Sequence, residues 1–406
     1  MSDAPLAGLR IVECATYVAG PSGGMALAQL GADVIRVDPV GGATDYRRWP
    51  LAPGGASLYW HGLNKGKRSV AVDLRAPAGQ ELVTALITAP GADGGVFLDN
   101  NVRRAWLSWP VLSQQRADLV HVHVEGHRDG RPAVDYTVNA GVGIPDMTGP
   151  EAAGAPVNHV LPAWDLLTGS TAAVGLLALL RRRDRSGKGG LVHLALADVA
   201  LAAVASLGWF TEARLAGRNR PRHGNHVYGS FGVDFPTADG RRVMVVALTR
   251  AQWRALCQVT GTDEVFQALQ VALGVDLDDE PGRYLHRETI AAILRTWFEV
   301  RELGTVNALL EAAHVLWGPY RTALDVVRDH EATPAASPLT DHFQPGIGPV
   351  LGMGTPLRLG DAAAVPAPAP ELGADTSAVL ADVLGLTSTE IGRLHDRGVV
   401  ASPGTG

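Results

Sequence analysis

The sequence predicts an α/β protein with a mostly parallel sheet, and three observations support this prediction. With 406 residues and 46% apolar composition, the chain can bury a large core. Strand-like apolar runs alternate with helical segments through its first half. The strand expected at Leu9 to Cys14 is followed by a turn and helix start at Gly20-Pro21-Ser22, a helix at 25–30 and a strand at 34–37. Such a βαβ unit has parallel strands, which need helices on both faces of the sheet.

Further elements follow in the same alternation. We expect strands at 69–74, 95–98, 119–124 and 191–196, and helices at 79–88 and after Asp165. The pattern breaks at a polar loop over 214–229. A strand at 242–248 and a helix capped by Thr249 then begin a second unit. We therefore predict a large domain formed by residues 1–224 and 321–406, and a small domain formed by residues 225–320.

The C-terminal part of the large domain begins with an extended segment. Residues 362–370 repeat Ala-Pro, which favours a stiff extended connector. Two helices are expected after it, at 376–386 and 388–397, and they complete the predicted elements.

Charge and composition indicate which partners to expect. A net charge of -6 and a pI near 6.1 give no field that would gather nucleic acid or an anionic membrane. The most apolar run, residues 172–180, is shorter than the ~20 residues of a membrane span. Cys14 and Cys257 are far apart, which disfavours a disulfide framework. Because residues 1–5 lack a basic and apolar leader, we expect a cytoplasmic protein.

The first βαβ unit also raises the possibility of a nicotinamide enzyme. Asp38 ends the second strand, where an acid would bind a ribose hydroxyl. However, residues 18–24 do not form a GxGxxG turn, and Pro21 lacks the backbone N–H that a pyrophosphate would use. The sequence therefore disfavours a dehydrogenase.

Two basic segments lie at the ends of predicted strands. Lys65, Lys67 and Arg68 surround a glycine before one strand, and Arg75 follows that strand. Such a turn can bind phosphates, although an ordinary solvated loop has the same composition. Residues 100–104 offer amide and guanidinium donors after the strand at 95–98, which is a usual ligand rim and equally a usual helix start.

Asp165 lies at the start of an almost uncharged helix. One interpretation is an N-cap, in which the carboxylate accepts backbone N–H bonds. The other is a nucleophile, whose pKa we expect the helix N-terminus to lower so that the group stays ionised for attack. The two interpretations are compatible.

Two histidines alternate along the strand at 119–124. His121 and His123 therefore share a face, but no third metal ligand follows at a fixed spacing nearby. We expect packing or surface roles for them and no metal site. No Gly-x-Ser-x-Gly nucleophile turn occurs in the chain.

Taken together, several segments resemble the class III coenzyme A transferases of the CaiB/BaiF type. The segments that carry this resemblance are residues 6–13, 20–21, 30–38, 64–74, 162–169, 187–189, 224–225, 239–240, 318–319 and 372–373. They follow the family order over nearly the whole chain. Within the family, residues 63–69, 134–139, 157–165, 239–246 and 318–322 are similar to the branch that moves CoA between the C1 and C4 carboxyls of mesaconate.

The resemblance implies a fold and an activity. The fold would be a Rossmann-like large domain built from both chain ends, a smaller α+β domain, and an interlocked homodimer. The activity would be an intramolecular CoA transfer through an aspartyl mixed anhydride and an aspartyl-CoA thioester, with Asp165 as the nucleophile. Coenzyme A would enter as part of the acyl-CoA substrate, with no permanently bound cofactor.

Two alternative activities remain open within the family. One is intermolecular CoA transfer to another dicarboxylate. The other is α-methylacyl-CoA racemisation, for which the family uses a His immediately before the Asp matched by Asp135. Here that position is Val134, so the racemase interpretation lacks one of its two bases.

The resemblance also implies site residues. Residues expected to contact CoA are Lys65, Lys67, Arg68, Val72, Asp73, Leu74, Arg75, Asn100 and Arg104. Residues expected to contact the acyl group are Val18, Tyr136 and Asn139. Backbone N–H groups at the start of the helix that follows Asp165 are expected to stabilise an oxyanion.

Overall fold

The computed structural model describes residues 4–100, 104–152, 154–359 and 365–403. Contacts divide the chain into two compact units. The first comprises Met1–Val142, Val160–Leu215 and Pro334–Gly406, and the second comprises Gly143–His159 and Ala216–Thr333. The predicted small domain, 225–320, has different bounds and does not include residues 143–159. Compact units of this kind do not by themselves define domains, so the predicted division into domains stays a prediction.

The first unit is built on a seven-stranded sheet in the order β12-β3-β2-β1-β4-β5-β6. Its strands are β1 Arg10–Cys14, β2 Asp33–Pro39, β3 Arg68–Val72, β4 Val96–Asp99, β5 Val120–Glu125, β6 Gly190–Ala195 and β12 Val400–Ala401. Neighbouring strands pair in parallel except β12, which runs antiparallel to β3. The predicted α/β fold with a mostly parallel sheet is confirmed.

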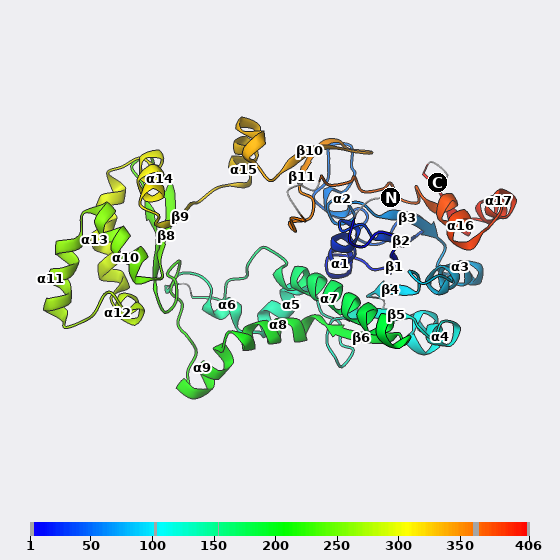
Figure 1. The fold of residues 1–406 in the computed structure, drawn as a ribbon, viewed down its shortest axis with the longest axis horizontal. Helices are drawn as coiled ribbons and strands as arrows, with labels where there is room; N and C mark the ends of the chain where they lie inside the picture. Colours follow the sequence, from blue (N-terminus) through cyan, green and yellow to red (C-terminus); the bar gives the residue numbers. More distant parts are fainter. Residues whose placement is uncertain (1–3, 101–103, 153, 360–364, 404–406) are drawn as a thin grey trace. The chain divides into compact units, whose positions relative to one another are not determined.

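Helices cover both faces of this sheet (Figure 1). Those on one face are α1 Ala19–Ala28 and α7 Ala163–Ser186, and those on the other are α3 Pro77–Thr88, α4 Trp109–Gln115, α16 Thr376–Leu384 and α17 Ser388–Asp396. Side chains alternate accordingly along each strand. Ile11 packs in the core with Leu27 and Leu176, whereas Val12 packs in the opposite core with Leu86 and Leu380.

The start of α1 lies close to the prediction. The sequence predicts a turn and helix start at Gly20-Pro21-Ser22, and these residues lie in the first turn of α1, which begins at Ala19. Proline is compatible with a first helical turn because the N–H it lacks has no intrahelical partner there. The other predicted elements of this unit shift by one or two residues, and residues 362–364 of the expected connector lie outside the described residues.

Shorter elements complete the first unit. They are α2 Leu58–Leu63, η1 Ala105–Leu107, α5 Asp135–Gly141, α8 Leu196–Ser206, η2 Pro334–Ala336 and the antiparallel pair β10 Thr340–Gln344 and β11 Gly348–Gly352. Helix α9, Trp209–Ala216, ends where the second unit begins. The α2 and α5 helices follow β-strand ends and contribute side chains to the site described below.

The second unit contains the antiparallel strands β7 Phe231–Pro236, β8 Arg242–Ala247 and β9 Leu316–Pro319. Its helices are α6 Ile144–Met147, α10 Arg250–Thr260, α11 Asp263–Leu273, α12 Glu280–Leu285, α13 Arg287–Glu299, α14 Leu303–Ala312 and α15 Ala323–Ala332. Phe235 stacks on Phe298 in its core, with ring centroids 4.2 Å apart. The expected Thr249 cap is confirmed, because its side chain accepts the N–H of Gln252.

Helix α7 is long and apolar enough to cross a membrane, as are α8 and α9 taken together with a bend of 64°. In this fold, however, α7 packs along α1 (Figure 1). A Cβ at Gly169 would lie 2.7 Å from the Ala19 carbonyl oxygen, and one at Gly23 would lie 2.8 Å from the Gly169 carbonyl oxygen. The two backbones therefore touch, and one side of α7 is buried in the core of the first unit.

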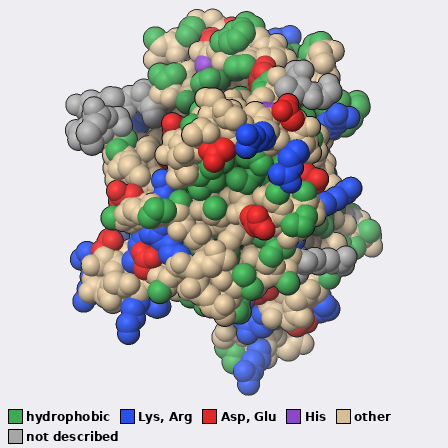
Figure 2. Space-filling view, turned by 90° about the vertical axis from the view of Figure 1, so that its right-hand side faces the viewer, with side chains coloured by type: hydrophobic (Ala, Val, Ile, Leu, Met, Phe, Trp, Pro, Cys, Tyr) green, Lys and Arg blue, Asp and Glu red, His purple; other side chains and the backbone are tan. Residues whose placement is uncertain are grey.

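Charged side chains are mixed on the surface. On the face drawn in Figure 2, basic and acidic groups are interspersed among apolar ones. A mixture of this kind does not create a strong field of one sign.

Candidate active site

A pocket of about 510 Å³ lies at the carboxyl ends of the parallel strands in the first unit. The residues that line it are Thr16, Tyr17, Val18, Ala19, Arg48, Tyr59, Asn100, Val124, Glu125, Gly126, Pro132, Ala133, Val134, Asp135, Tyr136, Pro162, Asp165 and Leu196. They come from the loops after β1, β2, β4 and β5, from the end of β5, from α2, and from the starts of α1, α5, α7 and α8. This is the usual ligand position in an open α/β sheet.

Asp165 is the third residue of α7, and it does not cap that helix. The N-cap position is Pro162, and the N–H groups of Trp164 and Asp165 donate to Asp135 Oδ2 at 2.7 and 3.2 Å. Within the described residues, no side-chain hydrogen bond of Asp165 is present. The N-cap interpretation of Asp165 is therefore wrong, because a carboxylate from α5 takes that role.

The pKa of Asp165 is raised to about 7. Burial is the largest cause and the nearby Asp135 carboxylate adds to it, while the Arg48 guanidinium acts in the opposite direction. The expected lowering by the helix N-terminus is wrong. The N–H groups that would supply it already bind Asp135, and so the predicted oxyanion donors at the start of α7 are occupied as well.

Arg48 lies in the same pocket between two tyrosines. Its guanidinium carbon is 5.5 Å from the centre of the Tyr17 ring and 5.3 Å from that of Tyr59. The backbone of Tyr17 is in the left-handed region, with φ 65°, and its N–H donates to Asp45 Oδ2 at 2.9 Å. A cation and a carboxyl group therefore line one cavity.

The fold brings together four of the predicted site residues, Val18, Asn100, Tyr136 and Asp165, all of which line this pocket. Asn100 is fixed by two hydrogen bonds with the Thr16 backbone, at 2.9 and 3.1 Å. The Tyr136 hydroxyl donates to the Val160 carbonyl oxygen at 3.5 Å. Asp165 and three of the residues predicted to contact the ligand thus lie at one site.

Lys67 does not fit its predicted role as a phosphate contact. Its ammonium group is buried and donates to Glu13, to the Pro21 carbonyl oxygen and to Asn64, at 2.8–2.9 Å. Glu13 also lies 3.7 Å from the buried guanidinium of Arg36. All three ammonium protons are used inside the protein, so none remains for a phosphate.

Two other predicted cations lie away from this pocket. Arg68 begins β3, at the amino end of the sheet, and forms an ion pair with Asp33 at 2.8 Å. Lys65 donates to the Gly62 carbonyl oxygen at 2.9 Å and lines a separate pocket of about 480 Å³. In this structure, therefore, the predicted basic turn does not act as one phosphate-binding group.

The remaining predicted residues have mixed positions. Val72 and Leu74 are buried at the end of β3, and the Asp73 carboxylate accepts the N–H of the exposed Arg75 at 3.0 Å. Asn139 is fully buried and accepts the Trp164 indole N–H at 3.0 Å, and it does not line the pocket. The predicted contact between Asn139 and the acyl group therefore does not fit this placement.

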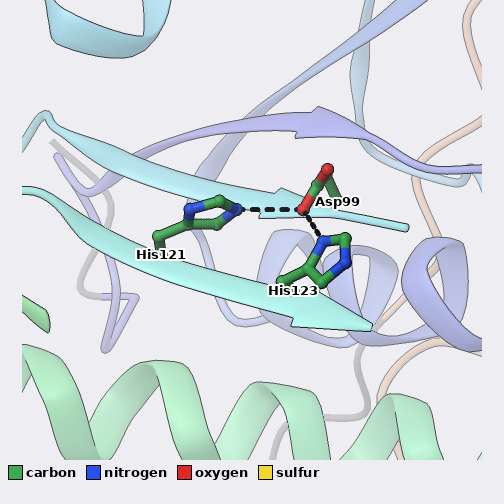
Figure 3. A group of neighbouring side chains, drawn as sticks. All are labelled: Asp99, His121 and His123. Atoms are coloured by element: carbon green, nitrogen blue, oxygen red, sulfur yellow. Dashed lines mark hydrogen bonds and ion pairs between the residues drawn. The ribbon is translucent and has the colours of Figure 1, made fainter. Parts of the chain in front are cut away.

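Arg104 lines a third pocket, of about 490 Å³, on the face of the sheet that α4 covers. There Asp99 Oδ1 accepts hydrogen bonds from His121 Nε2 at 2.9 Å and His123 Nδ1 at 2.7 Å (Figure 3). Burial opposes ionisation of Asp99, but the two hydrogen bonds outweigh this effect and lower the pKa of Asp99. The hydrogen bond to Asp99 also raises the pKa of His123. Sequence spacing missed Asp99 because it comes from the neighbouring strand.

Asp99, His121 and His123 each offer one atom that could bind a metal ion. These three atoms lie within 4.8 Å of one another, as a divalent metal site would require. Ligands on a common tetrahedral zinc ion, at roughly 2.0–2.1 Å each, lie about 3.3 Å apart. The two distances to Asp99 are shorter, 2.7 and 2.9 Å, and match hydrogen bonds. The group is therefore a hydrogen-bonded cluster in this structure.

Sequence reasoning missed several pocket residues. Arg48, Tyr17 and Tyr59 carry no motif, and they meet only because the loop after β2, the β1–α1 loop and α2 fold over one cavity. Asp135 was singled out only as a racemase position. The capping role of Asp135 could have been suspected from the residue before α7. The N-cap residue, Pro162, has no side-chain acceptor, so the first N–H groups of the helix need an acceptor from another segment.

Comparison with known proteins places this geometry in a family. Residues 6–376 match the description of CoA-transferase family III. A 2-methylfumaryl-CoA isomerase of Chloroflexus aurantiacus is 50% identical over 404 residues, covering 98% of each chain. A succinyl-CoA:mesaconate CoA-transferase of Haloarcula hispanica is 27% identical over 86% of this chain and 89% of its own.

A solved structure supports the same assignment. The crystal structure of a CAIB/BAIF family protein from Brucella suis aligns with a TM-score of 0.75 and 25% identity, over 94% of this chain and all of that one. Because the family match spans most of the sequence and the fold agrees, this chain belongs to CoA-transferase family III, a family of enzymes.

Proposed function

We propose that this enzyme isomerises 2-methylfumaryl-CoA by moving CoA between the C1 and C4 carboxyls of mesaconate. The observation that carries the proposal is Asp165, a carboxyl group without a side-chain hydrogen bond within the described residues, in a pocket at the carboxyl edge of the sheet. The 50% identity to the Chloroflexus aurantiacus isomerase over nearly the full chain supports the choice of acyl group.

The reaction proceeds in four acyl transfers at one side chain. The Asp165 carboxylate attacks the C1 thioester carbonyl, the C–S bond breaks, and a mixed anhydride and CoA thiolate form. The thiolate attacks the Asp165 carbonyl of the anhydride, which gives an aspartyl-CoA thioester and free mesaconate. Mesaconate then attacks this thioester through its C4 carboxylate and releases the thiolate. The thiolate finally attacks C4, so that mesaconyl-C4-CoA leaves and the Asp165 carboxylate is restored.

Retaining the freed mesaconate makes the transfer intramolecular. A dicarboxylate held in the pocket has an effective concentration far above that of free acids, up to ~10⁵ M or more when well oriented. Coenzyme A is thus carried by the substrate and returned on the product, and the proposal needs no bound cofactor.

Incubation with mesaconyl-C1-CoA alone tests the proposal. We expect the C4 regioisomer to form without an added acid, resolved by chromatography and mass spectrometry. Product that appears only with a second carboxylic acid would instead identify an intermolecular transferase. Mesaconyl-C1-CoA has no hydrogen on its α-carbon, so a racemase would be identified by α-proton exchange in a saturated 2-methylacyl-CoA, without movement of CoA. Val134 and the use of Asp135 as a helix cap both argue against that activity.

The nucleophile has a separate test. The Asp165→Ala variant should lose at least about 10³-fold in turnover, because every step passes through this carboxyl group, and it should still bind the CoA ester. Borohydride reduction during turnover should modify Asp165 in the wild-type enzyme. An unmodified Asp165 peptide would contradict an aspartyl thioester.

We further propose a cytoplasmic homodimer whose small domain is formed mainly by residues 225–320. Exposed apolar side chains on two long helices of the first unit support a partner surface. Val174 on α7 is 66% exposed, and Leu201 and Leu207 at α8 are 43% and 62% exposed. Sedimentation at micromolar concentration should give twice the chain mass.

A further inference from the structure

The pocket that holds Asp165 contains an imbalance of charge. Among the described residues that line it, three are carboxylic acids, Glu125, Asp135 and Asp165, and Arg48 is the only Lys or Arg. Asp165 is affected by both signs, since Asp135 raises its pKa and Arg48 opposes that rise. An anionic acyl group that enters this pocket therefore needs Arg48 as its counter-charge.

Arg48 is held in place by the protein before any ligand binds. Its backbone N–H donates to the Asp45 carbonyl oxygen at 3.1 Å, and the Ser57 hydroxyl donates to its carbonyl oxygen. Ser57 is also the N-cap of α2, the helix that carries Tyr59. The guanidinium of Arg48 lies close to both the Tyr17 and Tyr59 rings. Binding of an anion to this guanidinium therefore needs little reorganisation of the side chain.

The Arg48 guanidinium has no carboxylate partner among the described residues. Arg36, Arg68, Arg116 and Arg242, by contrast, each form at least one ion pair. Arginine presents two parallel N–H donors that match the two oxygens of a carboxylate. The group is therefore suited to an anion from the substrate.

We infer that Arg48 binds the free carboxylate of a dicarboxylic acyl group while the other carboxyl reacts at Asp165. This inference rests on the proposed function and names its specificity residue. A mesaconyl group has one esterified and one ionised carboxyl, and the two exchange roles during isomerisation. Arg48 thus selects dicarboxylic over monocarboxylic acyl groups and retains the freed mesaconate while it turns.

A pair of CoA esters tests the inference. The probes are mesaconyl-C1-CoA and (E)-2-methylbut-2-enoyl-CoA, in which a methyl group replaces the distal carboxylate. Their dissociation constants are measured by calorimetry in an Asp165→Asn background, which prevents turnover. We expect the dicarboxylic ester to bind more tightly and Arg48→Gln to remove about 10- to 100-fold of that preference, the usual range for a charge-assisted hydrogen bond.

Matched variants separate this role from others. Arg48→Lys should keep part of the preference, and Arg47→Gln, which changes an exposed neighbour outside the pocket, should keep all of it. Equal weakening of both esters by Arg48→Gln would overturn the inference, because it would indicate a contact with CoA itself or a structural role. An unchanged preference would overturn it as well.

The inference and the proposed function fail in different ways. If the wild-type enzyme isomerises mesaconyl-C1-CoA but Arg48→Gln keeps the binding preference, the inference alone is wrong. If the wild-type enzyme does not isomerise the ester, the proposed function is wrong, and the binding preference still decides whether Arg48 recognises a second carboxylate.

Discussion

Asp165 combines two requirements that oppose each other. As the proposed nucleophile it must be ionised to attack a thioester, yet burial and the adjacent Asp135 raise its pKa to about 7. A carboxylate destabilised in this way is a stronger nucleophile than one in water, because Brønsted behaviour links basicity to reactivity. In the proposed mechanism, the protonated fraction of Asp165 at neutral pH would be inactive.

The pH dependence of kcat/KM should report this carboxyl group. Because only the ionised form attacks, kcat/KM should fall about tenfold per pH unit below a pKa near 7 and should level off above it. The measurement is initial isomerisation rate against pH from about 5 to about 9. A profile that is flat over this range would contradict the raised pKa.

The Asp135→Asn variant is the control for the cause of this shift. Its amide oxygen can still accept the N–H groups of Trp164 and Asp165, while the negative charge beside Asp165 is removed. The acid limb of the profile should therefore move to lower pH. An unmoved limb would mean that burial alone sets the pKa of Asp165.

At the scale of elements, the site depends on how α7 lies against α1. Both backbones approach at glycines, which bring the start of α7, and hence Asp165, to the carboxyl edge of the sheet. A Cβ at Gly169 would lie 2.1 Å from Ser22 Oγ and 2.7 Å from the Ala19 carbonyl oxygen. The second of these atoms belongs to the backbone and cannot turn away.

Gly169→Ala should therefore destabilise the fold by about 1–3 kcal/mol and displace Asp165 enough to lower kcat. The matched control is Gly175→Ala, in the same helix, where the nearest atom would be 3.7 Å away. That change should be neutral or stabilise by up to about 1 kcal/mol, because alanine favours a helix. Urea unfolding of both variants measures the difference, and equal effects would exclude the crossing as the cause.

At the scale of the whole molecule, buried charges tie the sheet to the segments around it. Lys67 pairs with Glu13 at 2.8 Å, and Arg36 pairs with Asp38 and Asp45 at 2.8 and 3.2 Å. Asp45 also accepts the Tyr17 N–H, so this network supports the loops that carry the pocket. The network stabilises these loops, although Lys67 itself does not line the pocket.

Lys67→Met should cost about 3–5 kcal/mol of unfolding free energy, because it leaves Glu13 buried without its partner. The folded variant should bind a CoA ester with an unchanged dissociation constant, as expected for a lysine that makes no phosphate contact. Lys188→Met, at an exposed position, should change stability by less than about 0.5 kcal/mol. Selective loss of CoA-ester binding by Lys67→Met would restore the phosphate role.

The sequence alone located the proposed nucleophile, Asp165, but not its surroundings. Asp165 could be found because proline, an acid and a long apolar helix follow one another locally. Asp135, 30 residues away, takes over the cap and changes the pKa of Asp165, and no local pattern encodes that contact. Arg48 was missed for the same reason, since its partners Tyr17 and Tyr59 come from other segments.

The sequence by itself determined the alternation of strands and helices, the parallel sheet and the family, and it singled out the carboxyl group proposed to react, because these follow from local periodicity and short motifs. Only the tertiary structure decided which polar groups face each other. Lys65, Lys67 and Arg68 are neighbours in the chain, yet they end in a side pocket, a buried network and an ion pair at the amino edge. Successive side chains diverge, and the charge that each one meets depends on elements distant in sequence.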